Sequence, residues 1–208
     1  MKQAIPDTSR ERIPQEQALK IHPDAVMPTL PAGDLWVFGY GSLMWRQGFE
    51  SVEQHRATLF GYHRSLCVSS HVHRGTAEVP GLVLGLDRGG SCRGRVFRVA
   101  REHKDSVAQY LYAREMPTAV YSAKVLQVKC ADGRTVSALT FVVDRAHQQY
   151  LQGLSPQQLA DIVDRAAGIS GTSADYLAST LAQLKTQQVR DRKLEAIASY
   201  SKRLGSSG

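Results

Sequence analysis

The sequence predicts an α+β fold, in which a small, mainly antiparallel β-barrel or sheet is flanked by helices and the last third of the chain is helical. Strand-like segments follow one another through short turns that contain glycine, and such turns connect antiparallel strands rather than those of a doubly wound parallel sheet. Apolar residues recur with helical periodicity from about residue 155 onward. The chain of 208 residues is long enough to bury a substantial core.

We expect one domain over residues 34–204, an N-terminal extension over residues 1–33 and a flexible tail over residues 205–208. The extension is polar and contains five prolines, so it either wraps the domain or stays mobile. The chain has no run of about 18 apolar residues that could span a membrane, and its N-terminus has no apolar core of signal-peptide type. These features predict a cytoplasmic protein without a membrane partner.

The charge pattern and the cysteines bear on the partner class and on the redox compartment. The net charge is +7, but the basic residues are scattered and nowhere form a block, so the charge pattern does not favour a nucleic-acid partner. The cysteines Cys67, Cys92 and Cys130 are widely spaced and odd in number, which argues against a disulfide framework and fits a reducing compartment. Cys67 and Cys92 lie in apolar strand-like segments, where we expect buried, inert thiols.

The first half of the chain is predicted to be mostly strands. The first strand carries apolar residues from Leu35 to Phe38, and after a polar stretch a long strand covers residues 57–69, with a bend or bulge at Gly61. Alternating leucines predict a strand over residues 81–86. The run Arg88-Gly89-Gly90-Ser91 predicts a hairpin that returns as a strand over residues 92–99.

The second half begins with a helix over residues 102–114, which Pro117 ends because a proline biases the residue before it away from helical geometry. Two further strands, over residues 119–129 and 135–144, flank a turn at Asp132-Gly133. A capping box with proline at the first helical position, Ser155-Pro156-Gln157-Gln158, then opens a helix that we expect Gly168 to close. Two more helices are predicted after Ser173 and from about Asp191.

The most distinctive stretch is Phe-Gly-Tyr-Gly-Ser-Leu-Met-Trp over residues 38–45. Glycines at alternate positions allow a tight turn after the first strand, and they let a ligand approach the backbone N–H groups. Such an array suits a small anion, especially a carboxylate. Taken alone, the stretch is better explained as a glycine hairpin between two strands.

Four further short motifs lie downstream of this stretch: His73-Arg74-Gly75-Thr76, Pro80-Gly81, Tyr110-Leu111 and Arg114-Glu115-Met116. Together these segments resemble the γ-glutamylcyclotransferases of the ChaC family, in their bacterial form, from about residue 36 to about residue 194. The resemblance implies a γ-glutamylcyclotransferase-like fold and a cofactor-free, metal-free lyase that degrades glutathione in the cytoplasm. It also implies a catalytic Glu115, a nearby Tyr121, and binding of the γ-glutamyl end by Gly39, Tyr40, Gly41, Ser42 and Leu43.

Glu115 is a candidate proton shuttle on its position alone. It lies at the C-terminal end of a predicted helix, where the helix dipole disfavours negative charge and raises the pKa of a carboxyl group. The neighbouring Met116 and the tyrosines at positions 110 and 112 add apolar surroundings. An exposed ion-pair partner of Arg114 is the alternative role for this side chain.

The chemistry implied for glutathione needs little more than such a glutamate. The α-amine of the γ-glutamyl unit attacks its own γ-carbonyl, closes 5-oxoproline and expels Cys-Gly. Well-oriented intramolecular reactions gain roughly 7–11 kcal/mol in this way. Proton transfer from an amine of pKa about 8 to a glutamate of about 4.3 is uphill by roughly 5 kcal/mol, and burial that raises the glutamate by about two units removes about half of this. Glu115 is therefore expected to act as general base and then as general acid.

Other residues have two interpretations each. Arg74 could bind a substrate carboxylate through two hydrogen bonds or hold a loop, and Tyr121 could line the site or fill the core. Ser42 is not in a G-x-S-x-G context, which argues against a serine hydrolase. His71 and His73 share a strand face with Cys67, but zinc needs three or four converging ligands, which the sequence does not supply.

Two rival functions remain at this point. The first is a cyclotransferase acting on other γ-glutamyl amines or peptides, because the sequence does not show which residues contact the Cys-Gly side of glutathione. The second is a non-enzymatic nucleic-acid-binding module, since Phe38-Gly39-Tyr40-Gly41 faintly matches an RNA-recognition strand, although the basic residue that should precede it is absent. Nothing in the sequence indicates the oligomeric state.

Overall fold

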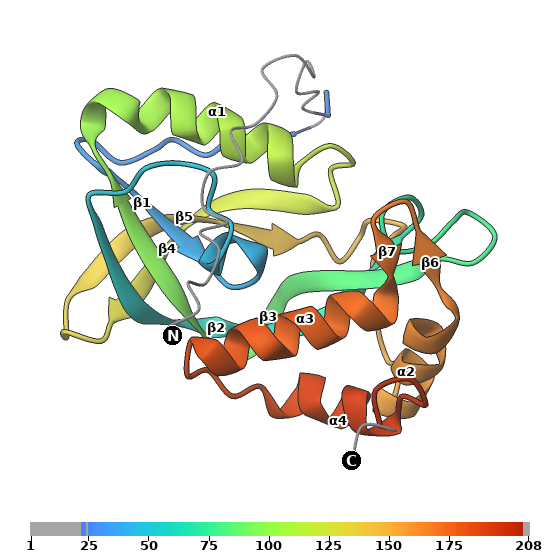
Figure 1. Ribbon diagram of the computed structural model, residues 1–208. Coiled ribbons are helices and arrows are strands. Elements are labelled where there is room, and N and C mark those ends of the chain that lie inside the picture. Colours follow the sequence, from blue (N-terminus) through green and yellow to red (C-terminus); the bar gives the residue numbers. More distant parts are fainter. Residues whose placement is uncertain (1–21, 24, 206–208) are drawn as a thin grey trace, which may run out of the picture.

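The computed structural model describes residues 22, 23 and 25–205 and has a closed barrel at its centre (Figure 1). The strand order is β1-β3-β2-β4-β5, and all neighbours are antiparallel except β1 and β5, which are parallel. The mainly antiparallel barrel predicted from the sequence is thus confirmed. Its strands are β1 (Leu35–Gly39), β2 (Glu53–Ser70), β3 (Gly81–Val99), β4 (Tyr121–Cys130) and β5 (Thr135–Val143).

The two longest strands, β2 and β3, pair along nearly their whole length. Their register shifts between Phe60 and Tyr62, around Gly61, which has a φ of +82°. The bulge predicted at Gly61 is confirmed, but the hairpin predicted over residues 88–91 is wrong, because these residues continue β3. The two glycines within that range have positive φ and lie beside the bulge, so they bend both strands together instead of reversing the chain.

Strand β2 also begins earlier than predicted, within the polar stretch over residues 51–56. Glu53 pairs with Arg98 in the ladder, and its carboxylate accepts a hydrogen bond of 2.7 Å from the Arg98 Nε. Arg98 in turn contacts Asp34 at 2.7 Å. Polar residues can form this part of the strand because they lie on the outer face of the barrel, where they pair across the strands.

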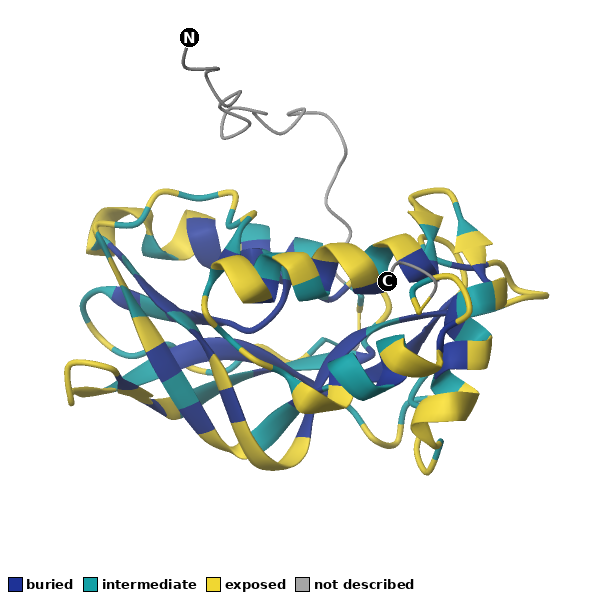
Figure 2. Cartoon of the chain, turned by 60° about the horizontal axis from the view of Figure 1, so that its bottom comes forward, coloured by how far each residue is buried: buried dark blue, intermediate teal, exposed yellow. Residues whose placement is uncertain are grey.

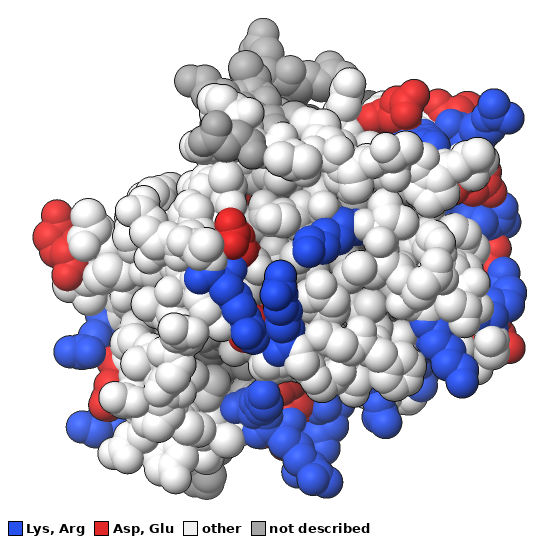
Figure 3. Space-filling view, turned by 180° about the vertical axis from the view of Figure 1, so that it is seen from behind, with Lys and Arg blue, Asp and Glu red and all other residues white. Residues whose placement is uncertain are grey.

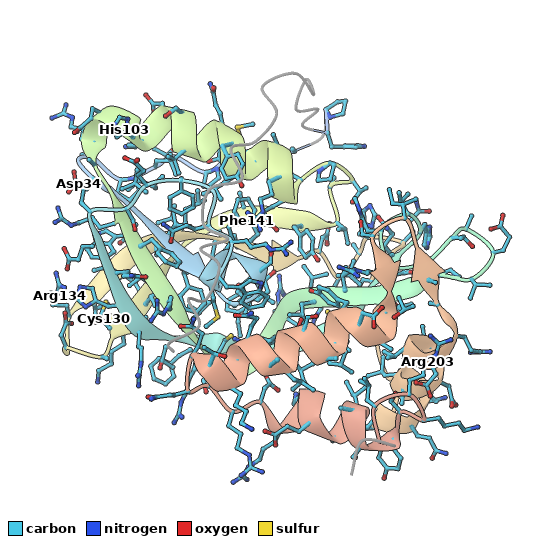
Figure 4. The ribbon with its side chains drawn as sticks, viewed as in Figure 1. Asp34, His103, Cys130, Arg134, Phe141 and Arg203 are labelled. Carbon is cyan, nitrogen blue, oxygen red and sulfur yellow. The ribbon has the colours of Figure 1, made fainter. Side chains whose placement is uncertain are left out.

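One helix covers an end of the barrel (Figure 1). It is α1 (Lys104–Glu115), and a single turn of 3₁₀-helix, η2 (Arg101–His103), precedes it. Tyr112 of α1 packs edge-on against Phe141 of β5, with ring centroids 6.2 Å apart, and Figure 4 shows Phe141 between the helix and the strands. Ala25 and Leu30, which belong to the N-terminal extension, pack on the same apolar cluster.

The other helices form the C-terminal third, as predicted. They are α2 (Pro156–Arg165), α3 (Ser173–Thr186) and α4 (Arg192–Tyr200), and they lie together along the β2–β3 pair (Figure 1). The capping box of Ser155 and Gln158 is present in full. A second capping box, between Thr172 and Asp175, opens α3.

The helix expected to close at Gly168 ends three residues earlier, at Arg165. Gly168 instead lies in a short strand, β6 (Ala167–Gly168), which pairs with β7 (Gly171–Thr172). A Cβ on Gly168 would lie 2.4 Å from the carbonyl oxygen of Val72. Glycine is therefore needed at this position for close backbone approach, a role that the sequence does not distinguish from helix termination.

Buried residues follow the strands and the inward faces of the helices (Figure 2). The largest apolar cluster joins the barrel to the C-terminal helices, since it contains Phe38 and Leu59 together with Leu177 and Leu194. All three cysteines are buried free thiols. Across the described residues, every helix is too short or too polar to cross a bilayer. Residues 1–21 and 24 of the predicted extension, and residues 206–208 of the predicted tail, lie outside the described part.

Candidate active site

The glycine motif forms the turn that follows β1. The chain leaves the barrel at Gly39 and enters a 3₁₀ turn, η1 (Ser42–Met44). A Cβ on Gly39 would lie only 3.0 Å from the Leu43 Cβ, so this turn is tight enough to need glycine there. The backbone N–H groups of Gly41, Ser42 and Leu43 have no acceptor among the described residues, as is usual for the first N–H groups of a helical turn. They are free to bind an anion.

Glu115 is the last residue of α1, as the sequence predicts. Its side chain is 20% exposed. Burial raises the pKa of Glu115 above its ordinary value of 4.5, while the adjacent Arg114 guanidinium opposes the shift by stabilising the carboxylate. The predicted ion pair with Arg114 does form, at 3.1 Å, but it is a partly buried pair and not the exposed one considered above.

Arg114 connects Glu115 to the glycine turn. Its Nη2 donates to the Ser42 Oγ at 2.8 Å, and its Nη1 donates to the carbonyl oxygen of Arg46 at 2.6 Å and to the Tyr110 hydroxyl at 3.0 Å. The end of α1 and the η1 turn are therefore held side by side through one guanidinium. The structure thus brings together Glu115 and Ser42, which are far apart in the sequence.

Two tyrosines hold the backbone of β3 at Leu84. The Tyr121 hydroxyl donates to the Leu84 carbonyl oxygen at 2.6 Å, and the Leu84 N–H donates to the Tyr176 hydroxyl at 3.2 Å. A Cβ on Gly41 would lie 3.5 Å from the Leu84 side chain. The glycine turn and both tyrosines therefore meet at the same residue of β3.

A third tyrosine, Tyr40, lies within the glycine motif itself. Burial raises the pKa of Tyr40 and of Tyr121 well above 10, and raises the pKa of Tyr176 to about 12; the charge of the nearby Glu115 contributes to each shift. All three phenols are therefore protonated at neutral pH and lie near the Glu115 carboxylate. The Tyr121 proton is already donated to the Leu84 carbonyl oxygen, so the phenols of Tyr40 and Tyr176 are the ones that can donate to a polar ligand without competing with Glu115 for a proton.

Tyr176 is the residue of this group that sequence reasoning missed. It lies in α3, the helix predicted to begin after Ser173, where it packs against the main apolar cluster. However, its hydroxyl accepts a hydrogen bond from β3, and it lies near enough to Tyr40 and Tyr121 to raise the pKa of both phenols. A tyrosine on the apolar side of a helix carries no sequence signal that separates a core residue from one that lines a site.

Arg74 lies beside this group but is engaged in holding a loop. Its Nη1 donates to the carbonyl oxygens of Ser170 and Thr172, at 2.5 and 3.4 Å, which ties it to the β6–β7 hairpin. Its guanidinium also lies over the Tyr176 ring, 5.2 Å from the ring centroid. The contacts of Arg74 thus match the structural interpretation, and its link to the site passes through Tyr176.

The histidines considered as zinc ligands have other partners. His71 shares a hydrogen bond of 2.8 Å with the Ser69 Oγ, and His73 shares one of 2.9 Å with the Ser170 Oγ. Cys67 is buried, and its thiol packs near Gly85. Within residues 22, 23 and 25–205, no three His, Cys, Asp or Glu side chains are grouped as metal ligands would be.

Arg64 is a second residue that the sequence does not single out. It counted among the scattered basic residues, but its side chain is buried below the glycine turn, where it donates to the carbonyl oxygen of Tyr40. On the face shown in Figure 3, Lys and Arg side chains lie in several separate places with Asp and Glu among them. Arg64 differs from these surface residues in being buried.

Two surface hollows lie away from Glu115. One, of about 410 Å³, opens between β2 and β4 and includes Phe60 and Leu126 in its lining. The other, of about 370 Å³, lies between α1 and the loop that contains Phe49, and Tyr110 lines it. Neither includes Glu115 or the glycine turn, so the candidate site is defined by its converging side chains and free backbone N–H groups.

A protein family, several curated proteins and several solved structures match this chain. The family described as ChaC-like protein matches residues 35–204. The glutathione-specific γ-glutamylcyclotransferase of Escherichia coli K12 is 37% identical over 172 residues, which cover 83% of this chain and 74% of that protein. The glutathione-specific γ-glutamylcyclotransferase 1 of Mus musculus is 30% identical over 184 residues, covering 84% and 82%. The crystal structure of a glutathione-specific γ-glutamyl cyclotransferase from yeast matches with a TM-score of 0.71 at 20% identity, covering 82% and 98%, and thus has the same fold.

Proposed function

The chain belongs to the family of ChaC-like proteins, and from this premise we propose that it is a γ-glutamylcyclotransferase that cleaves glutathione into 5-oxoproline and Cys-Gly. The observation that carries the proposal is the pairing of a partly buried Glu115 with the glycine turn through Arg114. A carboxylate of raised pKa lies here next to backbone donors that suit a substrate carboxylate. These are the two elements that an intramolecular cyclisation of a γ-glutamyl group requires.

In the proposed reaction, the carboxylate of Glu115 takes a proton from the ammonium group of the γ-glutamyl unit. The free amine attacks the γ-carbonyl carbon, and the C=O double bond opens to an oxyanion. When the oxyanion collapses, the bond to the nitrogen of Cys-Gly breaks, and the protonated Glu115 returns its proton to that nitrogen. The attacking nitrogen loses its second proton to the released amine, so that Cys-Gly leaves with an ammonium group and the lactam nitrogen keeps one hydrogen. The products are a five-membered lactam and the free dipeptide, and Glu115 ends the cycle as a carboxylate.

The raised pKa of Glu115 suits both halves of this cycle. A glutamate with an ordinary pKa would be too weak a base for an ammonium group, whereas burial brings the two pKa values closer together. Arg114 opposes the shift because it stabilises the carboxylate, which is the form of Glu115 that can accept a proton. The remaining barrier is reduced by orientation, since both reacting groups belong to one molecule.

The remaining residues are proposed to hold the γ-glutamyl group. The free N–H groups of Gly41, Ser42 and Leu43 are suitable donors to its α-carboxylate or to the developing oxyanion. Tyr121 is proposed to line the same space, and its hydrogen bond to Leu84 supports this by fixing its side chain beside the turn. Gly39 permits the tight turn, and Tyr40 supplies a protonated phenol near Glu115.

We propose that the protein works in a reducing compartment, the cytoplasm. All three of its cysteines are free thiols within the described structure. Burial raises the pKa of Cys67 to about 12 and also raises the pKa values of Cys92 and Cys130, so these thiols are poorly reactive. Reduced glutathione, the proposed substrate, prevails in the same kind of compartment.

The test is incubation of the purified protein with glutathione, with 5-oxoproline and Cys-Gly measured together. Equal amounts of the two products are expected, because one cyclisation releases one of each. A parallel incubation with γ-glutamyl dipeptides that lack Cys-Gly tests whether the substrate is glutathione or γ-glutamyl compounds in general. Release of glutamate instead of 5-oxoproline would indicate hydrolysis and would contradict the proposal.

A further inference from the structure

A buried ion pair lies below the glycine turn, and the proposed reaction does not use it. Arg64 of β2 and Asp191, which precedes α4, are joined by a contact of 2.8 Å between Nη1 and Oδ2. The Arg64 side chain is 2% exposed and that of Asp191 is 13% exposed. Burying two charges carries a large desolvation penalty, and an apolar pair of similar volume often serves folding as well or better. The stability of the fold therefore does not explain why this ion pair is buried here.

Arg64 makes contacts with several segments around the glycine turn. Its Nε donates to the carbonyl oxygen of Tyr40, and its Nη2 donates to the carbonyl oxygen of Arg93 at 2.8 Å. The same Nη2 lies 4.0 Å from the sulfur of Met44, at the end of η1. Asp191 is held in turn, because its Oδ1 caps α4 by accepting from the Leu194 N–H at 3.3 Å. One guanidinium thus links β3, the glycine turn and the start of α4.

The bond to Tyr40 determines how the next N–H group is oriented. The peptide between Tyr40 and Gly41 is trans and planar, so its C=O and its N–H point in opposite directions. Because the C=O points down to Arg64, the Gly41 N–H points to the other side of the turn. That N–H has no acceptor among the described residues. A cation bound to the carbonyl oxygen also polarises the peptide and makes its N–H a stronger donor.

We propose that Arg64, held by Asp191, is a positioning residue that directs the Gly41 N–H at the α-carboxylate of the γ-glutamyl substrate. It acts through the Tyr40–Gly41 peptide and does not touch the substrate. This inference rests on the proposed function, because it concerns how the same site recognises its substrate. It also connects α4 to substrate binding, because Asp191 both caps this helix and holds Arg64.

The experiment compares two substrates that differ only in the α-carboxylate. One is glutathione, and the other is γ-aminobutyryl-Cys-Gly, which keeps the amine and the γ-carbonyl and can cyclise to a lactam. The quantity measured is the ratio of the two kcat/KM values. A residue that acts on α-carboxylate recognition changes this ratio, whereas a residue that only supports the fold lowers both activities in proportion.

The main variant is the double substitution R64M/D191N, which removes both charges and leaves neither one unpaired. We expect the preference for glutathione to fall about tenfold or more, which corresponds to the loss of one hydrogen bond to a charged group. The control is D164N. Asp164 also holds the C-terminal helical part, through the Ser201 Oγ and the Lys202 N–H, but it has no contact with the glycine turn, so the preference is expected to stay unchanged.

An unchanged preference in a folded R64M/D191N protein would overturn the proposal. If that protein does not fold, R64K decides, because lysine can pair with Asp191 but has no fork to bind the carbonyl oxygens of Tyr40 and Arg93 together. Its preference is expected to fall, and a preference equal to that of the wild type overturns the proposal. If the proposed function itself is wrong, the wild-type protein releases no 5-oxoproline from glutathione. This result distinguishes failure of the proposed function from failure of the role of Arg64.

Discussion

The Nε of Arg114 lies 3.1 Å from Oε1 of Glu115, its neighbour in the chain. Adjacent residues of a helix do not ordinarily face each other, because they point about 100° apart around the axis. The contact is possible here because α1 ends at Glu115 and Met116 has left helical geometry. The end of the helix therefore gives Glu115 a cationic neighbour that also binds Ser42.

Replacing Glu115 with glutamine should remove the proton carrier and leave the shape of the site intact. We expect kcat to fall by at least about 10²–10⁴, the usual contribution of general acid–base catalysis, with glutathione binding largely retained. Turnover is measured as 5-oxoproline release and binding by calorimetry. E102Q is the matched control, because Glu102 lies exposed in η2 near the other end of α1. Retained turnover in E115Q would contradict the assignment of the base.

Replacing Arg114 with glutamine should shift the pH dependence of the reaction. Burial raises the pKa of Glu115 and Arg114 lowers it, so the pKa rises further when the cation is removed. Glu115 must be ionised to act as base, and activity is therefore lost as the pH falls through that pKa. The acid limb of kcat/KM against pH should move to higher pH in R114Q. A limb that stays in place, or that moves to lower pH, would show that Arg114 does not control this carboxylate.

The two glycines of the turn should respond differently to alanine. In G39A the new Cβ would lie 3.0 Å from Leu43 and 3.4 Å from Phe97, and overpacking of this kind lowers the free energy of unfolding by about 1–3 kcal/mol. In G41A the Cβ would meet Leu84 at an ordinary 3.5 Å, so the fold should be little affected. Chemical denaturation measures both. An equal loss of stability in the two variants would refute this account of the turn.

A larger residue at position 41 tests binding instead of folding. The side chain of G41V would occupy space beside Leu84, where Tyr121 and Tyr176 are also held. We expect KM for glutathione to rise, or turnover to be lost, while the unfolding transition stays cooperative. Kinetics equal to those of the wild type would exclude the turn as part of the binding site.

Removing the hydroxyl of Tyr121 should affect both stability and activity. Y121F loses the 2.6 Å hydrogen bond to the Leu84 carbonyl oxygen, a loss of about 1 kcal/mol in the free energy of unfolding, and kcat/KM is expected to fall as well. Y150F is the matched control, since the Tyr150 hydroxyl donates to the Asp87 Oδ2 at 3.0 Å and not to the β3 backbone at Leu84. It should lose at least as much stability, because its hydrogen bond is to a carboxylate, and keep its kcat/KM. Equal losses of kcat/KM in both variants would count against a role of Tyr121 in the site.

Asp87 should make the folded state sensitive to acid. Burial alone raises the pKa of Asp87, but hydrogen bonds from Arg145, the Arg88 N–H and Tyr150 outweigh it and bring the pKa below its ordinary value of 3.8. Asp87 thus stabilises the fold above about pH 4, where aspartate in the unfolded chain is ionised, and this contribution is lost as the pH falls through the lower folded pKa. D87N should be less stable than the wild type at pH 7, and the difference should shrink on acidification. A difference independent of pH would contradict this.

Much of the fold was predictable because local chemistry agrees with the tertiary structure. The alternating leucines of β3 and the capping box at Ser155 indicate strand and helix without reference to distant residues. The predicted hairpin over residues 88–91 was wrong because glycines with positive φ have the same sequence signature in a tight turn and in a bend within a strand. Only the partner strand, with its bulge at Gly61, distinguishes the two cases.

The candidate site was predictable in part for a similar reason. The glycine turn and Glu115 have distinctive local sequence, and the structure places them together. Arg64 and Tyr176 have none, because the role of each depends on a contact with a residue far along the chain, Asp191 or Leu84. For Arg74 the sequence left two roles open, binding a substrate carboxylate or holding a loop, and its guanidinium binds the β6–β7 hairpin; substrate contact by Arg74 stays a prediction.

The site draws on both ends of the described chain. The glycine turn follows β1, whereas Tyr176 lies in α3 and Asp191 caps α4, so the turn is synthesised well before either of them. A ribosome must therefore extend the chain as far as Asp191 before every member of the site exists. We expect chains that stop short of this residue to be inert toward glutathione.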